Sequence, residues 1–249
     1  MRKLIVVIVV LCVAGGCARD EVVWNETNYS APPRETVMPV GQVVPGAGGC
    51  PGSVSAVRAG AVTFAAWWKV RADSSAELVV GRSHDGGASW ESVVTADSTD
   101  HSVRGCARPE PAVAADSASG YVSIAYFIEP AAGRGIFFCH SMDGGRTFHS
   151  PVPIVFGDNT PSVSIAMSGD RVAVAYEDPN STEPVVGVAL SRTMGHIFEN
   201  REAISSDNER AGQPAVALRH HTVRVWWSDH SADPRVSATR TAYREGVWN

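Results

Sequence analysis

The sequence lacks several features that would assign it to particular classes of protein. Its longest apolar run, Leu4 to Ala14, is shorter than the roughly 20 residues that a membrane-spanning helix needs. The net charge is −5, so the charge balance does not favour a nucleic-acid partner. No CxxC or HExxH motif is present, and we therefore expect neither a bound metal ion nor another cofactor.

The N-terminus has the pattern of an export signal. Two basic residues precede the apolar run, which ends in the sequence VAGGC at Cys17. This ending resembles the lipobox of bacterial lipoproteins, whose cysteine is lipidated and becomes the first residue of the mature protein. The resemblance implies that residues 1–17 are a signal peptide and that acyl chains on Cys17 anchor the protein to a bilayer. Cleavage as an ordinary secretory signal is the alternative.

The rest of the chain divides into a linker and one folded domain. Residues 18–34 are polar and show no periodicity, so we interpret them as a tether between membrane and domain. Residues 35–249 contain short runs of valine, alanine and aromatic residues, which favour an all-β fold.

Two octapeptides in the domain match closely. They are SHDGGASW, from Ser83 to Trp90, and SMDGGRTF, from Ser141 to Phe148. Weaker copies, SRTMGHIF and TAYREGVW, begin at Ser191 and Thr241. The pattern resembles the Asp box of the sialidase family, also called the bacterial neuraminidase repeat.

The residues before each box repeat as well. An alternating run ends at an aromatic residue in each unit: Trp68, Tyr126, Tyr176 and Trp227. The box begins 15 residues later in the first three units and 14 residues later in the fourth. Each unit therefore predicts four strands, A to D, with the box between C and D. Such units, repeated about every 50 residues, predict a β-propeller of four four-stranded blades.

The ring also needs a closing strand. The fourth unit ends directly after its box and so lacks a D strand. Residues 35–44 resemble a D strand, and we expect them to pair with the last blade and close the propeller.

The boxes themselves are expected to be scaffold. A carboxylate and a hydroxyl two residues apart cap the backbone N–H groups of a tight turn, the glycines permit its conformation, and the aromatic residue is buried. A catalytic or Ca²⁺-binding role for the aspartates is the alternative. The predicted structural residues are Ser83, Asp85, Gly87, Trp90, Ser141, Asp143, Gly145 and Phe148.

The resemblance implies that a ligand binds at the opposite end, on the B–C and D–A loops. These loops include Arg104, Arg134 and Asp158. The aromatics in register at the ends of the B strands are expected to pack between blades instead. The predicted ligand-binding face comprises Trp67, Arg71, Arg108, Glu110, Asp178, Arg210, Trp226 and Asp229.

Sialidases hold the substrate carboxylate with three arginines and use a tyrosine nucleophile that a glutamate activates. Arg71, Arg108 and Arg210 are candidates for such a cluster. Weak candidates for the tyrosine and glutamate are Tyr126, Tyr176, Glu129 and Glu177. The family's Arg-Ile-Pro motif is absent and no residue matches the catalytic pattern one by one, so we assign no catalytic residue.

Three cysteines remain after the signal. Cys50 and Cys106 each lie a few residues before a predicted A strand, on the same face of adjacent blades, and form a candidate disulfide. Cys139 lies on a predicted C strand and is interpreted as a buried free thiol.

Three functions are compatible with these observations. The favoured hypothesis is a membrane-anchored binding or assembly module of the cell envelope, periplasmic or surface-exposed, that holds a glycan, peptide or protein on its loop face. A sialidase-type glycoside hydrolase and a purely structural envelope protein are the alternatives.

Overall fold

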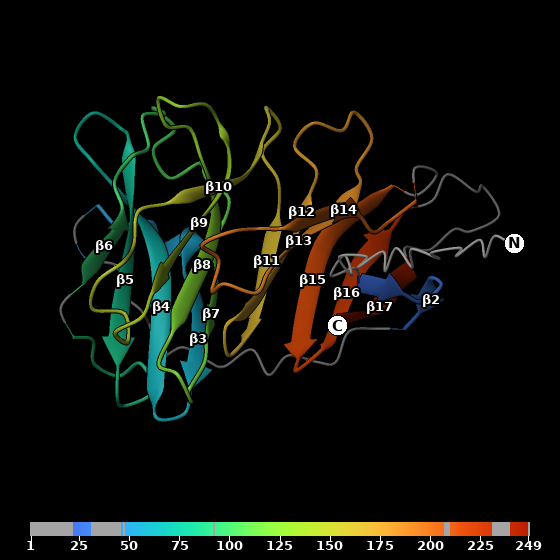
Figure 1. The fold of residues 1–249 in the computed structure, drawn as a ribbon. Helices are drawn as coiled ribbons and strands as arrows, with labels where there is room; N and C mark the ends of the chain where they lie inside the picture. The colour runs from blue at the N-terminus through green and yellow to red at the C-terminus, as the bar shows by residue number, and fades with distance from the viewer. Residues whose placement is uncertain are drawn as a thin grey trace, which may run out of the picture.

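The computed structural model describes residues 22–30, 46, 48–91, 93–206, 210–230 and 240–248 (Figure 1). The predicted signal peptide and the strand expected at residues 35–44 lie outside these residues. Within the described part of the chain, no helix is long and apolar enough to cross a membrane. One short 3-10 helix, η1 (Pro51–Ser53), precedes the first blade.

The repeats fold as four antiparallel sheets, as their spacing predicts. Blade 1 contains β3 (Ser55–Ala59), β4 (Val62–Val70), β5 (Ala76–Ser83) and β6 (Val94–Asp97). Blade 2 contains β7 (Ala112–Ala115), β8 (Val122–Ile128), β9 (Gly135–Ser141) and β10 (Val152–Phe156). Blade 3 contains β11 (Val163–Ser168), β12 (Arg171–Glu177), β13 (Val186–Ser191) and β14 (Asn200–Ala203). Blade 4 contains β15 (Ala211–Arg219), β16 (Thr222–Asp229) and β17 (Arg240–Trp248), with β1 (Val22–Trp24) and β2 (Asn28–Tyr29).

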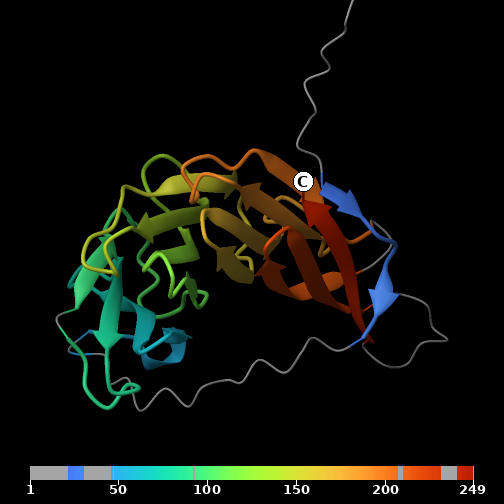
Figure 2. The same cartoon turned by 60° about the horizontal axis from the view of Figure 1, so that its bottom comes forward.

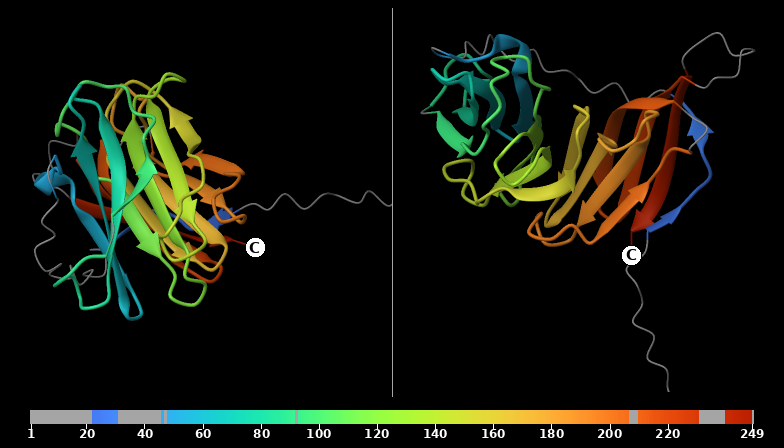
Figure 3. Two further views of the ribbon diagram at one scale, coloured as in Figure 1. Left: turned by 90° about the vertical axis from the view of Figure 1, so that its left-hand side faces the viewer. Right: turned by 90° about the horizontal axis from the view of Figure 1, so that it is seen from above.

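The blades follow one another along an arc, with blade 1 at one end and blade 4 at the other (Figures 2 and 3). The A strands of neighbouring blades contact each other, β3 with β7, β7 with β11 and β11 with β15. These strands are rich in alanine, serine and valine, whose small side chains allow the sheets to approach closely on the inner side.

An N-terminal strand completes the last blade, but it comes from residues other than those expected. Val22 pairs with Trp248 and Trp24 with Gly246, so β1 occupies the D-strand position beside β17. The interpretation of residues 18–34 as a tether is therefore wrong for β1 and β2. The sequence did not predict this strand because three residues are too few to show an alternating pattern. Its place depends instead on burial of Val22 between blades 3 and 4.

The prediction of a fourth Asp-box turn is also wrong, because Thr241–Trp248 forms part of the continuous strand β17. In the first three boxes the fourth and fifth residues have positive φ, including Gly144 (73°), Gly145 (74°) and Gly195 (87°). The fourth copy has Arg244 and Glu245 at these positions, where non-glycine residues disfavour that conformation. The chain therefore continues as a strand that pairs with β16.

The three remaining boxes form the predicted turns. In the second box, Ser141 Oγ accepts a hydrogen bond from Gly145 N (2.8 Å), and Asp143 accepts from Thr147 N (2.9 Å) and Thr147 Oγ1 (2.7 Å). Burial opposes ionisation of Asp143, but the hydrogen bonds from Thr147 and Ser141 outweigh it and hold the pKa of this carboxyl well below its usual range. These contacts support a scaffold role.

The first and third boxes make equivalent contacts. Ser83 Oγ accepts from Gly87 N (2.7 Å), and Asp85 accepts from both the N–H and the hydroxyl of Ser89. In the third box Thr193 replaces the aspartate, and its Oγ1 accepts from Ile197 N (3.0 Å). A hydroxyl thus preserves one acceptor of the turn where the carboxylate is absent.

We predict that Asp143→Ala lowers the free energy of unfolding by about 1–2 kcal/mol, because the backbone N–H groups that it caps lose their acceptor. Urea denaturation followed by tryptophan fluorescence measures this change. Asp158→Ala is the matched control, since the Asp158 side chain is 90% exposed and its removal should change stability by less than about 0.5 kcal/mol. Equal effects of the two variants would contradict the scaffold role of the box.

The core lies between adjacent blades. The in-register aromatics Trp68, Tyr126, Tyr176 and Trp227 are all at most 5% exposed, which confirms that they pack between sheets. Trp68 meets Tyr126 edge-on across blades 1 and 2, with ring centroids 5.9 Å apart. This packing fixes how the blades are placed, and with them the loops at either end.

Candidate functional site

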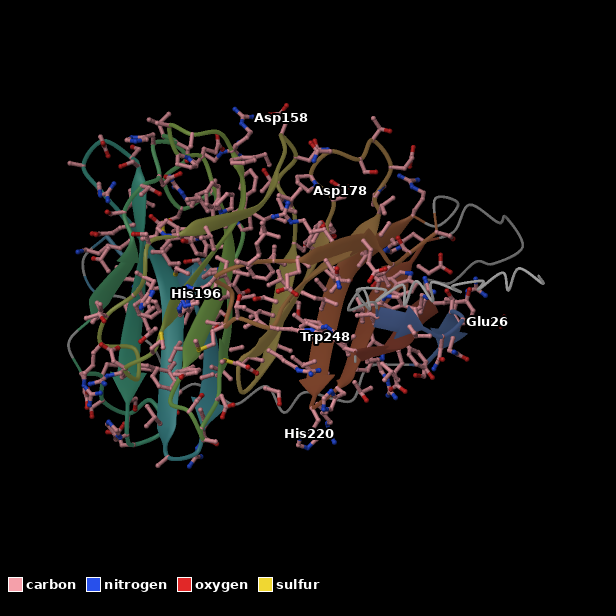
Figure 4. All side chains as sticks on the ribbon, in the orientation of Figure 1. Glu26, Asp158, Asp178, His196, His220 and Trp248 are labelled. Atoms are coloured by element: carbon pink, nitrogen blue, oxygen red, sulfur yellow. A yellow bond between two sulfur atoms is a disulfide. The ribbon has the colours of Figure 1, made fainter. Side chains whose placement is uncertain are left out.

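The two ends of the blades carry different residues. Figure 4 shows Asp158 and Asp178 at one edge of the molecule and His220, in the turn between β15 and β16, at the opposite edge. The loops after the B and D strands thus share one end of the blades, as the repeat predicts. We call this end the loop face.

Arg108, a predicted ligand-binding residue, is part of the interior. Its side chain is 3% exposed and donates to Asp100 Oδ2 (2.5 Å) and to the carbonyl oxygen of Ser102 (2.8 Å). Asp100 also accepts from Ala76 N in blade 1 and from Glu129 N in blade 2. The ion pair therefore ties the connection between these blades to both of them.

The same connection carries the predicted disulfide. Cys50 and Cys106 are bonded, with their Cα atoms 5.5 Å apart. Cys139 is buried and unbonded, as expected. The disulfide and the buried ion pair together hold the segment between β6 and β7 in one conformation.

A charged cluster lies on this anchored rim of the loop face. Glu129 Oε1 is 2.5 Å from Arg104 Nε, and Glu129 Oε2 is 3.4 Å from Arg134 Nη2. Arg134 also approaches Asp158 at 3.6 Å. The side chains of Arg104 and Arg134 are 38% and 43% exposed, so their N–H groups remain accessible. Glu129, a weak catalytic candidate, thus contacts arginines rather than a tyrosine.

The two candidate tyrosines lie in the core. Tyr126 is fully buried, and its hydroxyl donates to Asp97 Oδ2 (2.7 Å). Burial, followed by the nearby Cys139 and Asp97, raises the pKa of Tyr126 far above its usual value. Tyr176 is 5% exposed, and burial raises its pKa to about 12. The hydroxyl of Tyr126 is therefore closed to a substrate.

The predicted surface tryptophans are also buried. Trp67 lies within β4 and is 3% exposed, and Trp226 lies within β16 and is 4% exposed. Each precedes a tryptophan packed between blades, so alternation turns it to the outer face of an end blade. There Arg224 covers the ring of Trp226 at 5.6 Å. The prediction that Trp67 and Trp226 belong to the ligand-binding face is therefore wrong.

The predicted arginines do not form one cluster. Arg71 Nη2 donates to the carbonyl oxygen of Ser98 (3.0 Å), and Arg210 Nε lies 3.3 Å from Glu183. Arg108 is enclosed by the connection between blades 1 and 2. Each guanidinium thus has its own partner within the protein, and the three are not arranged to bind one substrate carboxylate together.

The remaining acidic candidates have separate structural contacts. Glu177 accepts from the backbone N–H groups of Ser162 (3.0 Å) and Gln213 (2.8 Å), which links blades 3 and 4. Asp178 accepts from Asn180 N within a tight turn. Asp229 is buried and accepts from Arg240 (3.0 Å). Burial raises the pKa of Glu110.

No protein-family model matches the sequence, and no curated protein is similar enough to serve as a relative. Among solved structures, Hadza microbial sialidase Hz136 aligns with a TM-score of 0.51 and 17% sequence identity, over 76% of this chain and 43% of that one. The fold is that of a sialidase-like β-propeller.

Two further sialidases align over similar parts of this β-propeller. They are NanB from Streptococcus pneumoniae (TM-score 0.47, 14% identity, 77% of this chain and 30% of that chain) and the sialidase of Trypanosoma rangeli (0.49, 12%, 71% and 34%). This chain therefore spans less than half the length of the sialidases it resembles. At these identities the likeness concerns the fold and not the activity.

The structure also brings together three histidines that the sequence did not predict to meet. Possible ligand atoms of His140, His149 and His196 all lie within 4.8 Å of one another. They line a pocket of about 460 Å³ at the boundary of blades 2 and 3. Burial, aided by the two neighbouring histidines, lowers the pKa of His140 to about 4, so its ring is neutral at pH 7.

A signal for this cluster exists in the repeat register. His140 directly precedes the second box, His149 directly follows it, and His196 is the sixth residue of the third box. Short metal-binding sequence motifs do not reveal this histidine cluster, because its three residues come from two blades.

Proposed function

We propose that this β-propeller is an exported, lipid-anchored binding module that holds a glycan or a polypeptide on its loop face without hydrolysing it. The anchor is proposed from the VAGGC sequence at Cys17. The binding surface is proposed at the rim between blades 1 and 2, where Arg104, Glu129 and Arg134 meet.

The position of Tyr126 carries the non-catalytic part of this proposal. A tyrosine nucleophile must reach the anomeric carbon of a sugar and must be activated by a neighbouring base. The hydroxyl of Tyr126 is fully buried and donates to Asp97, and the raised pKa disfavours the phenolate. The side chain therefore contributes to packing between blades.

Rigid anchoring of the rim supports a binding role. A surface that is held in place before it meets a ligand loses less conformational entropy on binding. The Cys50–Cys106 disulfide and the Asp100–Arg108 ion pair provide this anchoring. Beside the accessible guanidinium groups, Val103 is 77% exposed and offers an apolar contact. Guanidinium forks next to an apolar side chain suit the carboxylate and hydroxyl groups of glycans or polypeptides.

The test uses the full-length protein in detergent micelles, assayed against a fluorogenic sialoside and on a glycan array. We expect no release of fluorophore above background. We expect Arg134→Ala to weaken binding to any retained glycan by about tenfold or more, the effect of losing one charge-assisted hydrogen bond.

Arg58→Ala is the matched control, because it removes the same charge from an exposed residue near the end of β3, beside the turn to β4 and at the opposite end of blade 1. This variant should bind as the wild type does. An array without a bound glycan would restrict the ligand to polypeptides. Turnover of the sialoside that Tyr126→Phe abolishes would refute the proposal and restore the hydrolase hypothesis.

A further inference from the structure

The histidine pocket occupies a defined position in the repeat. In blade 2 the residues that flank the box, His140 and His149, are joined by a backbone hydrogen bond from His149 N to His140 O (2.9 Å). Their side chains line the pocket together with His196 from the next box. Blade 1 has the same arrangement, in which Glu91 N donates to Arg82 O (2.8 Å).

The equivalent pocket between blades 1 and 2 contains charged side chains at the positions that histidines occupy between blades 2 and 3. It is lined by Arg82, Glu91, Val94 and Arg146, where Arg146 is the sixth residue of the second box. Arg82 forms an ion pair with Glu91, and its Nη1 donates to the carbonyl oxygen of Gly144 (3.0 Å). The charges in this pocket are therefore satisfied within the protein.

The pocket between blades 2 and 3 contains three imidazoles instead. The ring centroids of His149 and His196 each lie 4.5 Å from that of His140 and 5.6 Å from each other. Within the described ranges, no carboxylate forms an ion pair with any of the three. His140 is 4% exposed, and its buried Nε2 has no hydrogen-bond partner among the described residues.

An unsatisfied buried nitrogen is costly, by about 1–3 kcal/mol, and needs a reason. Three converging imidazole nitrogens with no anionic partner are a ligand set typical of transition metals. We propose that His140, His149 and His196 bind one divalent transition-metal ion, with Zn²⁺ as the preferred ion.

The geometry allows this with small movements. A tetrahedral Zn²⁺ ion with Zn–N bonds of about 2.0–2.1 Å places its nitrogen ligands roughly 3.3 Å apart. The ligand atoms here lie within 4.8 Å, so a side-chain shift of about 1 Å closes the site. His149 and His196 are exposed and free to make this shift, whereas His140 is buried in β9 and supplies the fixed ligand.

The fourth coordination position faces the pocket. The other residues that line the pocket, Phe148, Ser150, Val152 and Gly195, supply no carboxylate or thiolate as a fourth ligand that would complete a closed structural site. Three protein ligands with one open position leave room for a water molecule or for a donor group from a ligand. The site lies beside the box turns, away from the loop face, and does not depend on the function proposed above.

The experiment measures metal binding by the full-length protein, produced without a histidine tag and treated with a chelator before titration. Isothermal titration calorimetry with Zn²⁺ should give one site per chain. Co²⁺ should produce the visible absorption of a tetrahedral nitrogen-ligated ion, which a loose surface association does not produce.

His149→Asn and His196→Asn are the informative variants, because both side chains are exposed and their replacement should preserve the fold. Each should weaken Zn²⁺ binding by more than about 100-fold, the upper range for losing a group that only orients a metal ligand. His101→Asn is the matched control, an exposed histidine in the connection between β6 and β7, and should leave affinity and stoichiometry unchanged. Absence of a stoichiometric site, or equal affinity of all three variants, would overturn the proposal.

Discussion

Asp100→Ala is expected to lower the free energy of unfolding by about 3–5 kcal/mol, the range for leaving one buried charge without its partner. Asp100 and Arg108 have side chains only 2% and 3% exposed. The substitution would also leave the backbone N–H groups of Ala76 and Glu129 without the carboxylate that accepts from them. Urea denaturation at pH 7 measures the loss.

The matched control removes one partner of an exposed ion pair within blade 1. Lys69 Nζ lies 3.3 Å from Glu77, and the Lys69 side chain is 47% exposed. Lys69→Ala should change the free energy of unfolding by less than about 1 kcal/mol, because water screens the pair. If Asp100→Ala costs no more than this control, the ion pair does not hold blades 1 and 2 together as we infer.

Loss of the Cys50–Cys106 disulfide is the second large expected effect. The bond closes a loop across a sequence separation of 56 residues, and the chain-entropy treatment assigns about 4 kcal/mol to a loop of that size. Wild-type protein unfolded in urea with dithiothreitol should therefore lose about this much stability relative to protein unfolded without it.

The double variant Cys50→Ala/Cys106→Ala separates the bond from other effects of the reductant. It should be destabilised to a similar degree, and dithiothreitol should not destabilise it further, because Cys139, the other cysteine of the described residues, is unbonded. A wild-type protein whose unfolding is unchanged by dithiothreitol would contradict the prediction.

Both effects concern the same connection between blades, which has a consequence for function. The segment that carries Arg104 and Val103 is held by the disulfide on one side and by the ion pair on the other. Weakening either anchor should loosen the loop face before the blades unfold, because a surface connection opens locally at a lower free energy than the strands of the sheets. The large stability effects and the proposed binding surface therefore have one structural origin.

Sequence patterns predicted the candidate site less well than the fold. Tryptophan and arginine are residue types typical of carbohydrate-binding surfaces, and Trp67 and Arg108 both lie next to predicted loops. Whether such a side chain faces solvent depends on what packs over it, and spacing along the chain does not carry that information. Trp67 lies within a strand, and Arg108 pairs with the buried Asp100, eight positions earlier in the sequence.

The histidine cluster illustrates the same limit. His140 and His196 are 56 positions apart in the chain and come from different blades, so no local motif contains them. Their approach follows from the way blade 3 is placed beside blade 2. Knowledge of the repeat register alone would have put them at matching ends of adjacent blades, but not within reach of one metal ion.

The sequence by itself determined the four-blade repeat, the first three box turns and the packing of Trp68, Tyr126, Tyr176 and Trp227, because periodicity and turn chemistry act over a few residues. The tertiary structure alone decided that residues 22–24 complete the last blade, that Arg108 and Tyr126 are interior, and that three histidines converge. These outcomes depend on contacts between segments far apart in the chain, where burial and the placement of neighbouring sheets decide which side chains meet.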